Sequence, residues 1–478
     1  MLFDPARAVS RRQLLRRSAC GFGWLGLASM LAKDAAAQGP ANPLMPKSPH
    51  FPPRAKRVIF LFMAGGPSHL DTFDPKPRLN QDHGKPLPFK RPLAFAPGEV
   101  GNLFKSPWDF RKYGESGIEV SELFPNVARF VDELCVIRSM VGDSVAHGGA
   151  HLQLHTGSIN FARPSMGSWM IYGLGTENQN LPAFLTLKPG LENGGAKQWS
   201  SAFLPGAYQG TAVGHGGMKL TDLTEAIENV KNRDLTPEQQ RYELDMAQKM
   251  NRASAHRWQD DQELETRIQA FELAFRMQTT APEAFDISKE SAATRKLYGM
   301  DQPETYDFGW QCLMARRLAE RGVRFTQINH EYGPGNEVGW DAHRELVRLH
   351  TRTALQVDVP IAGLLYDLKA RGLLQDTLVI WGGEFGRTPI SQAGDGRDHN
   401  PYGYTMWMAG AGVKRGMIYG ATDDYGYYAV EDRMHIHDLH ATILHILGLN
   451  HEQLTYPYAG RNFRLTDVFG NVAHKILA

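Results

Sequence analysis

Short apolar runs, each followed by glycine or polar residues, recur along the chain and constrain its fold more than any other feature. The runs cover residues 57–63, 134–140, 183–187, 323–328, 377–381 and 404–408. Helical segments lie between or after them, at 308–321, 342–371 and 437–447, the last with Gly448 as its C-cap. Continuous apolar strands are typical of sheets that are covered on both faces. The alternation predicts an α/β fold, a doubly wound, mostly parallel sheet with helices on both faces.

Two stretches depart from this alternation. Residues 236–277 are polar, charged and helical in pattern, and Pro237 after Thr236 is a common helix start. We expect a helical insertion here, at about 222–300, that covers one side of the core. Residues 74–115 are rich in proline, lysine and phenylalanine, which predicts an extended surface excursion.

The N-terminal residues have the pattern of an export signal. A paired-arginine box, Arg11-Arg12, precedes a short glycine-rich apolar stretch at 19–32, and Ala35-Ala36-Ala37 supplies the small residues of a cleavage site. An ordinary basic region of a general secretory signal is the alternative, but the arginine pair favours the twin-arginine export machinery. We therefore expect a signal peptide at 1–37, a flexible lead-in at 38–55, one domain at 56–478, and a periplasmic or extracellular protein.

Composition excludes several classes of function. The chain has 42% hydrophobic and 22% charged residues and a formal net charge of +1, which gives no indication of a nucleic-acid partner. No segment after the signal is apolar for long enough to span a membrane. Cys135 and Cys312 lie in apolar contexts, so we expect two buried free thiols, although an export compartment permits a disulfide.

Metal-ligating residue types follow several of the predicted strands. In open α/β sheets, ligands bind beyond the carboxyl ends of the strands. The residues found there are His69, Asp71, His147, Asp341, His343, Glu384 and His399. Asp341 and His343 can reach one ion from a single turn, whereas the alternative for Asp341 is to cap a helix starting at Ala342. The set predicts one site for a divalent metal, zinc or calcium.

Three histidines, His147, His151 and His155, recur every fourth residue and so share one helical face. We expect His147, at the helix start, to face the site and His155 to pack, with His151 open to either role. A helix start also favours an anion such as a phosphate or sulfate ester. Arg387 has two interpretations, a partner for a substrate oxyanion or a structural salt bridge with Glu384 or Asp398.

Four motifs resemble a known family. They are Gly-Gly-Glu-Phe-Gly-Arg-Thr-Pro (382–389), Gly-Arg-Asp-His-Asn-Pro (396–401), Gly-Trp-Asp-Ala-His (339–343) and Arg-Pro-Ser-Met-Gly-Ser-Trp (163–169). From about Lys56 to the C-terminus, the chain is similar to a bacterial family of exported proteins, domain of unknown function 1501. Its members are often labelled sulfatases and are placed in the alkaline phosphatase and sulfatase superfamily.

The resemblance implies an alkaline phosphatase-like fold and roles for particular residues. Asp341, His343 and His399 match the ligands of the first metal of the superfamily. Glu384 and Phe385 stand where the superfamily has Asp-His or Asp-Asn, so one ligand position is occupied by phenylalanine. One metal site is therefore favoured over two.

The residue that ends the first strand also departs from the superfamily. The aspartate of that position is missing, and His69 or Asp71 is the candidate to replace it. His147 falls where the nucleophile would be, with Ser144 as a fallback nucleophile, and the sulfatase signature that matures to formylglycine is absent.

The expected function follows from both arguments. It is an exported metal-dependent hydrolase of phosphate or sulfate esters, acting on a small anionic ester or on a sulfated or phosphorylated polysaccharide. The alternative is a catalytically altered metal- or ligand-binding protein that keeps the alkaline phosphatase fold. The missing nucleophile and Phe385 motivate that alternative.

Overall fold

The computed structural model describes residues 42–92, 94–95, 100–218, 234–255, 262–330 and 339–478. The chain divides into two units, Met1–Asn42 and Pro43–Ala478, and the second is described below. The predicted signal peptide and the first residues of the lead-in lie outside the described residues.

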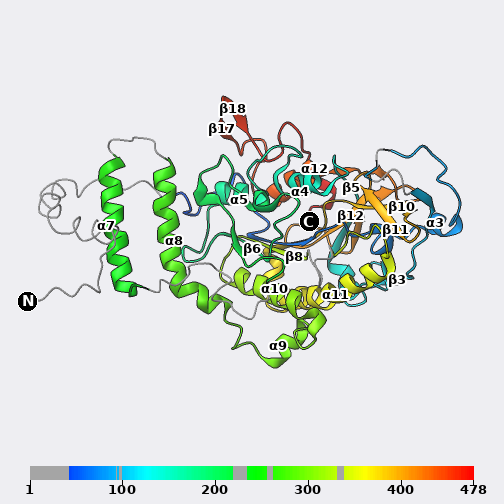
Figure 1. The fold of residues 1–478 in the computed structure, drawn as a ribbon, viewed down its shortest axis with the longest axis horizontal. Helices are drawn as coiled ribbons and strands as arrows, with labels where there is room; N and C mark the ends of the chain where they lie inside the picture. Colours follow the sequence, from blue (N-terminus) through cyan, green and yellow to red (C-terminus); the bar gives the residue numbers. More distant parts are fainter. Residues whose placement is uncertain (1–41, 93, 96–99, 219–233, 256–261, 331–338) are drawn as a thin grey trace, which may run out of the picture. The chain divides into compact units, whose positions relative to one another are not determined.

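A nine-stranded sheet forms the centre of the described part, in the order β13-β5-β12-β9-β1-β8-β6-β7, with β16 beside β5 (Figure 1). Its strands are β1 Arg57–Met63, β5 Leu134–Val141, β6 Phe184–Leu187, β7 Thr211–Val213, β8 Phe325–His330, β9 Thr377–Gly382, β12 Tyr404–Gly410, β13 Met417–Tyr419 and β16 Met434–His435. The six predicted strands are therefore confirmed, with ends that differ by at most two residues.

One strand of this sheet runs against the others. β12 pairs antiparallel with both β5 and β9, whereas the remaining pairs are parallel. The mostly parallel α/β fold is confirmed. Because β12 is reversed, the residues that precede it lie at the same edge as the residues that follow β5 and β9. Loops before and after strands thus meet at one edge of the sheet.

Side chains of β1 alternate between two hydrophobic cores. Ile59, Leu61 and Met63 enter the core that contains α10 and α11, and the even-numbered residues 58–62 enter the core that contains α5 and α12. Figure 1 shows α10 and α11 on one side of the sheet and α4, α5 and α12 on the other. Both faces are covered, as the continuous apolar strands predict.

The helices are α3 Pro77–Gln81, α4 His147–Thr156, α5 Met166–Leu174, α7 Pro237–Ala255, α8 Gln262–Phe285, α9 Ala292–Leu297, α10 Pro303–Glu320, α11 Leu346–Ala370 and α12 Ile436–Ile446. The region predicted as an insertion is helical in α7 and α8. Gly448, with φ +79°, follows α12 and donates to the His445 carbonyl, as expected near a C-cap. The predicted start of the long helix at 342 is wrong, because α11 begins at Leu346 after a turn.

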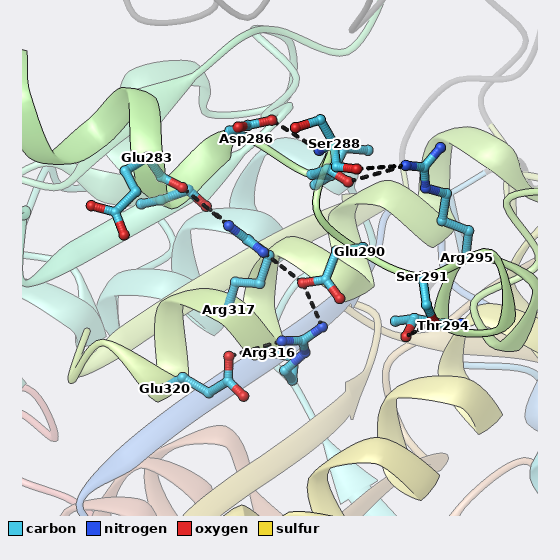
Figure 2. A network of polar contacts seen from close by, with 12 residues as sticks. Glu283, Asp286, Ser288, Glu290, Ser291, Thr294, Arg295, Arg316, Arg317 and Glu320 are labelled. Atoms are coloured by element: carbon cyan, nitrogen blue, oxygen red, sulfur yellow. Dashed lines mark hydrogen bonds and ion pairs between the residues drawn. The ribbon is translucent and has the colours of Figure 1, made fainter.

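Buried ion pairs attach the end of α8 to α10 (Figure 2). Glu290 accepts from Arg316 at 2.9 Å and from Arg317 at 2.5 Å. Arg317 also donates to the Ala284 and Glu283 carbonyls at 3.0 Å, and Arg316 pairs with Asp367 of α11 at 3.1 Å. The two arginines therefore join α8, α10 and α11.

The sequence did not predict β7, β13 and β16 of the main sheet, nor several short strands that lie outside it. β10 Gly386–Gln392 pairs antiparallel with β11 Gly396–Asn400 and with β2 Val100–Leu103. The region expected to be loops between 382 and 400 is thus largely a hairpin. The predicted excursion at 74–115 supplies α3, β2 and the strand β3. The remaining pairs are β3 Phe110–Tyr113 with β4 Ile118–Ser121, β14 Ala421–Thr422 with β15 Ala429–Glu431, and β17 Tyr456–Tyr458 with β18 Arg461–Phe463.

Cys135 on β5 and Cys312 on α10 are buried and free, which confirms the two predicted thiols. They belong to different cores, on opposite faces of the sheet. Among the helices of the described part, none combines the length and apolar character that crossing a bilayer requires.

Candidate metal centre

Four segments bring ligating side chains to one edge of the sheet. The loop after β5 leads into α4, whose first residue is His147. The turn before α11 carries Asp341 and His343, Glu384 follows β9, and His399 lies on β11, just before the reversed strand β12. Asp341 does not cap α11, which begins five residues later, so its carboxylate is free to face the other three segments.

The first group consists of His147, Asp341, His343 and His399, whose ligating atoms all lie within 4.8 Å of one another. Asp341 Oδ1 is 3.0 Å from His343 Nε2 and 3.2 Å from His399 Nε2. Asp341 Oδ2 is 3.2 Å from His147 Nε2, and the two Nε2 atoms of His343 and His399 are 2.8 Å apart. Four side chains from three segments thus converge on one point.

The hydrogen bonds of the far ring nitrogens decide where the lone pairs point. His399 Nδ1 lies 2.6 Å from the Val145 carbonyl, which only accepts, so Nδ1 carries the proton. His343 Nδ1 lies 2.6 Å from Gln392 Oε1, which also accepts, so His343 likewise carries its proton on Nδ1. Both Nε2 lone pairs therefore face each other and the Asp341 carboxylate. These three side chains are therefore candidate metal ligands, and orientation through the second ring nitrogen is typical of metal-ligating histidines.

Burial and neighbouring charges shift the pKa values of the residues in this centre. Burial alone would raise the pKa of Asp341, but the Arg387 guanidinium and the neighbouring imidazoles hold this pKa well below its usual range. Burial alone would lower the pKa of His147, but hydrogen bonds and charges of Asp341 and Glu384 raise it to about 9. Burial lowers the pKa of His399 to about 4, so its ring is neutral and available as a ligand.

A second group, His147, His151 and Glu384, shares His147 with the first. Glu384 Oε1 is 2.6 Å from His147 Nδ1 and 3.2 Å from His151 Nε2, and it also accepts from the Gly65 amide at 3.0 Å. His151 is buried, and within the described segments neither of its ring nitrogens has an aligned hydrogen-bond partner. His155 hydrogen-bonds the His151 carbonyl at 2.8 Å and packs among apolar residues, as expected.

Arg387 is buried and its donors are engaged within the protein. Nε donates to the Gly66 carbonyl at 2.9 Å, Nη1 to the Arg397 carbonyl at 3.2 Å, and Nη2 to Asp341 Oδ1 at 2.6 Å and to the Gly65 carbonyl. Of the two interpretations, the structure fits a structural ion pair, and the partner is Asp341 rather than Glu384 or Asp398.

Aromatic rings hold His399 in place. Phe385 stacks on it with ring centroids 4.3 Å apart, and Phe95 stacks on it at 4.7 Å. Two rings at these distances occupy opposite faces of the imidazole. A Cβ at Gly66 would lie 2.6 Å from the Phe385 ring, so glycine is required there for the close approach. Phe385 is therefore part of the wall of the centre.

Three predicted residues lie away from both groups. Asp71 is fully buried in an ion pair with Arg397, with Oδ2 2.8 Å from Nε and Oδ1 3.1 Å from Nη2. His69 Nε2 lies 2.8 Å from the Gly426 carbonyl. Ser144 Oγ donates to the Ala146 carbonyl at 2.9 Å, where it shapes the start of α4. These three residues belong to neither group of convergent ligands.

Sequence reasoning missed the residues that orient the ligands. Gln392 and the Val145 carbonyl fix the two imidazoles, and Phe95 covers His399 from a distant segment. Gln392 lies five residues after Arg387, but a polar residue in an expected loop gives no signal of this contact.

The fold and these ligands define an α/β protein with a candidate metal centre at the carboxyl edge of its sheet. The family model described as "Protein of unknown function (DUF1501)" matches residues 55–477, and the chain belongs to this family. Among curated proteins, none matches the chain.

Several solved structures are similar to the chain at low identity. An alkaline phosphatase from the Antarctic bacterium TAB5 has 11% identity over 83% of this chain and 99% of its own, with a TM-score of 0.34. The lipoteichoic acid synthase LtaP from Listeria monocytogenes has 9% identity over 88% and 78%, with a TM-score of 0.37. The PsFucS1 sulfatase from Pseudoalteromonas sp. has 13% identity over 83% and 68%, with a TM-score of 0.35.

Proposed function

We propose that this protein is an exported metal-dependent hydrolase of phosphate or sulfate esters. The observation that carries the proposal is the meeting of two Nε2 lone pairs and the Asp341 carboxylate at one point. Asp341, His343 and His399 would hold one divalent cation, with His147 beside them. Two imidazoles and one carboxylate favour zinc over calcium, because calcium prefers oxygen ligands.

Different residues of the chain orient the ligands and hold a proton at this centre. A bound divalent cation would supply Lewis-acid polarisation of the ester or of water. Gln392 and the Val145 carbonyl orient the two imidazoles, and Arg387 holds Asp341. At the start of α4, where free amide groups and the helix dipole favour an anion, His147 holds a proton at Nδ1 against Glu384.

Metal content tests the proposal directly. Elemental analysis of protein purified from the export compartment should find bound zinc, which Asp341→Ala and His399→Ala should lose. His474→Ala, which removes an exposed imidazole elsewhere, should keep it. Wild-type protein without bound divalent metal would refute the metal-dependent mechanism.

A panel of phosphate, phosphonate and sulfate esters then separates hydrolase from binder. Turnover that disappears in His147→Ala supports the hydrolase. Metal bound without turnover of any ester supports the alternative, a binding protein that keeps the fold. The buried Phe385 and the bonded hydroxyl of Ser144 are the observations that motivate this alternative.

Export belongs to the same proposal. Replacing the arginine pair, Arg11→Lys with Arg12→Lys, should keep the protein in the cytoplasm, because the machinery reads both guanidinium groups. Cell fractionation checks this outcome, and unchanged export of the double variant would contradict the twin-arginine route.

A further inference from the structure

A cavity of about 530 Å³ is lined by residues that belong to neither of the two groups described above. Its lining includes Asp143, His437, Glu452, Arg464, Phe469 and Asn471. The volume falls within the ~300–1,000 Å³ that is typical of small-molecule sites. The proposed metal centre does not use any of these side chains.

The cavity lies at the same edge of the sheet as the metal centre. β16 runs parallel to β5 and places His435 beside Val141, at the carboxyl end of β5. Asp143 follows two residues later, and the same loop continues to the Val145 carbonyl and to His147. One short loop therefore forms part of the cavity on one side and part of the metal centre on the other.

An aromatic ring forms one part of the cavity lining. The Phe469 side chain is 59% exposed, and its ring stacks on His437 with centroids 5.2 Å apart and an interplanar angle of 26°. His437 is buried, so it backs the ring and fixes its plane. The adjacent Val468 is 68% exposed and extends the apolar surface.

Polar groups form the rest of the lining. The side chains of Asp143 and Glu452 are 52% and 67% exposed and offer carboxylate oxygens to the cavity. Arg464 pairs with Glu452 at 3.4 Å. Burial lowers the pKa of His437 to about 4, so its ring adds no positive charge at neutral pH. Carboxylates outnumber cations here, which disfavours an anionic ligand and suits hydroxyl donors.

Asp143, His435 and His437 in this lining form a third group of candidate metal ligands, with ligating atoms within 4.8 Å of one another, but the hydrogen bonds of His435 disfavour a metal there. His435 Nδ1 accepts from the His437 amide at 3.2 Å, so a ring proton lies on Nε2. Nε2 donates that proton to Asp143 Oδ2 at 3.0 Å. The imidazole of His435 is thus satisfied and has no lone pair left for a cation.

We propose that this cavity binds an uncharged sugar residue. The apolar face of the sugar ring packs on Phe469, and its hydroxyl groups donate to Asp143 and Glu452. The inference rests on the proposed function and deepens it, because it makes the substrate a phosphate or sulfate ester of a carbohydrate. The ester group lies at the metal centre and a neighbouring neutral sugar lies in the cavity.

Calorimetric titration with neutral sugars tests this site without any turnover. The probes are cellobiose, lactose and the methyl glycosides of galactose and fucose, added to wild-type protein with and without a metal chelator. At least one should bind, equally well in both conditions. Phe469→Ala should weaken binding about tenfold, since a lost ring contact costs about 1.4 kcal/mol.

Two further variants sharpen the test. Glu452→Gln keeps the side-chain shape and should also weaken binding, because the amide is a poorer acceptor than the carboxylate. Tyr366→Ala removes a ring that is 54% exposed on α11 and should bind as wild type does. Both positions in the cavity are largely exposed, so thermal unfolding should show that the variants fold.

The outcomes separate this inference from the proposed function. Failure of all four sugars to bind wild-type protein, or equal binding by Phe469→Ala, overturns the sugar site even if esters are hydrolysed. Sugar binding in a protein that contains no metal keeps the site and refutes only the hydrolase.

Discussion

Gly66 shows how tightly the wall of the metal centre is packed. Its φ is +74°, and a Cβ there would lie 2.6 Å from the Phe385 ring. Gly66→Ala should lower the free energy of unfolding by about 2–4 kcal/mol, from the left-handed backbone and overpacking together. Urea denaturation measures this cost.

A double-mutant cycle isolates the contact with the ring. In a Phe385→Ala background the cost of Gly66→Ala should fall, because the ring atoms Cδ2 and Cε2 that clash are gone while the backbone strain remains. Equal costs in both backgrounds would show that the ring is not the obstacle.

Asp71 and Arg397 form an ion pair in which both side chains are fully buried. Asp71→Asn should lower the free energy of unfolding by about 3–5 kcal/mol, because it leaves the buried guanidinium without its counter-charge. The bound metal should remain, and elemental analysis checks this. Loss of metal on this substitution would instead support Asp71 as a ligand, a role predicted from the sequence for His69 or Asp71.

Individual ligands could be predicted where a metal-ligating residue type lies next to a predicted strand. Asp341, His343 and His399 follow or precede apolar strands, and the structure brings them together. Asp71 also follows a strand, but its partner Arg397 is 326 positions away. A local residue pattern carries no information about a partner so far away in the sequence. The sequence therefore could not show whether Asp71 is a metal ligand or an ion-pair partner.

At the scale of elements, Glu290 links the end of α8 to α10. Glu290→Gln should lower the free energy of unfolding by about 2–4 kcal/mol, since Arg316 and Arg317 lose the charge of a shared acceptor. Hydrogen exchange should increase locally at residues 284–291. An unchanged exchange pattern would mean that the apolar contacts of α8 alone fix this end.

Element prediction succeeded for apolar strands and failed for polar ones. Six of the nine strands of the main sheet are apolar runs, which sequence reasoning recognises. β11 reads Gly-Arg-Asp-His-Asn and is buried throughout, because ion pairs and hydrogen bonds satisfy its side chains. A strand without apolar residues is indistinguishable from a loop by pattern, so the hairpin that carries His399 was missed.

For the whole molecule, buried neutral histidines predict acid lability. Burial lowers the pKa of His330 to about 4 and of His350 and His440 to about 3. The unfolded chain, with a histidine pKa of about 6.5, binds more protons between about pH 6.5 and 4. The free energy of unfolding should therefore fall as pH falls through this range, by about 1.4 kcal/mol per pH unit for each histidine.

Urea titrations between pH 7.5 and 4.5 check this slope. His440→Gln keeps a donor for the Leu154 carbonyl but does not titrate, so its slope should be smaller by about one proton. An identical slope in the variant would show that His440 is protonated in the folded protein.

The two buried thiols have a consequence for where the chain can fold. Burial raises the pKa of Cys135 to about 12 and that of Cys312 well above its ordinary value, so neither forms the thiolate that exchange with a disulfide requires. They also lie on opposite faces of the sheet. The described part of the fold contains no disulfide, so we expect it to form without an oxidant in a reducing compartment and to stay unchanged in an oxidising one.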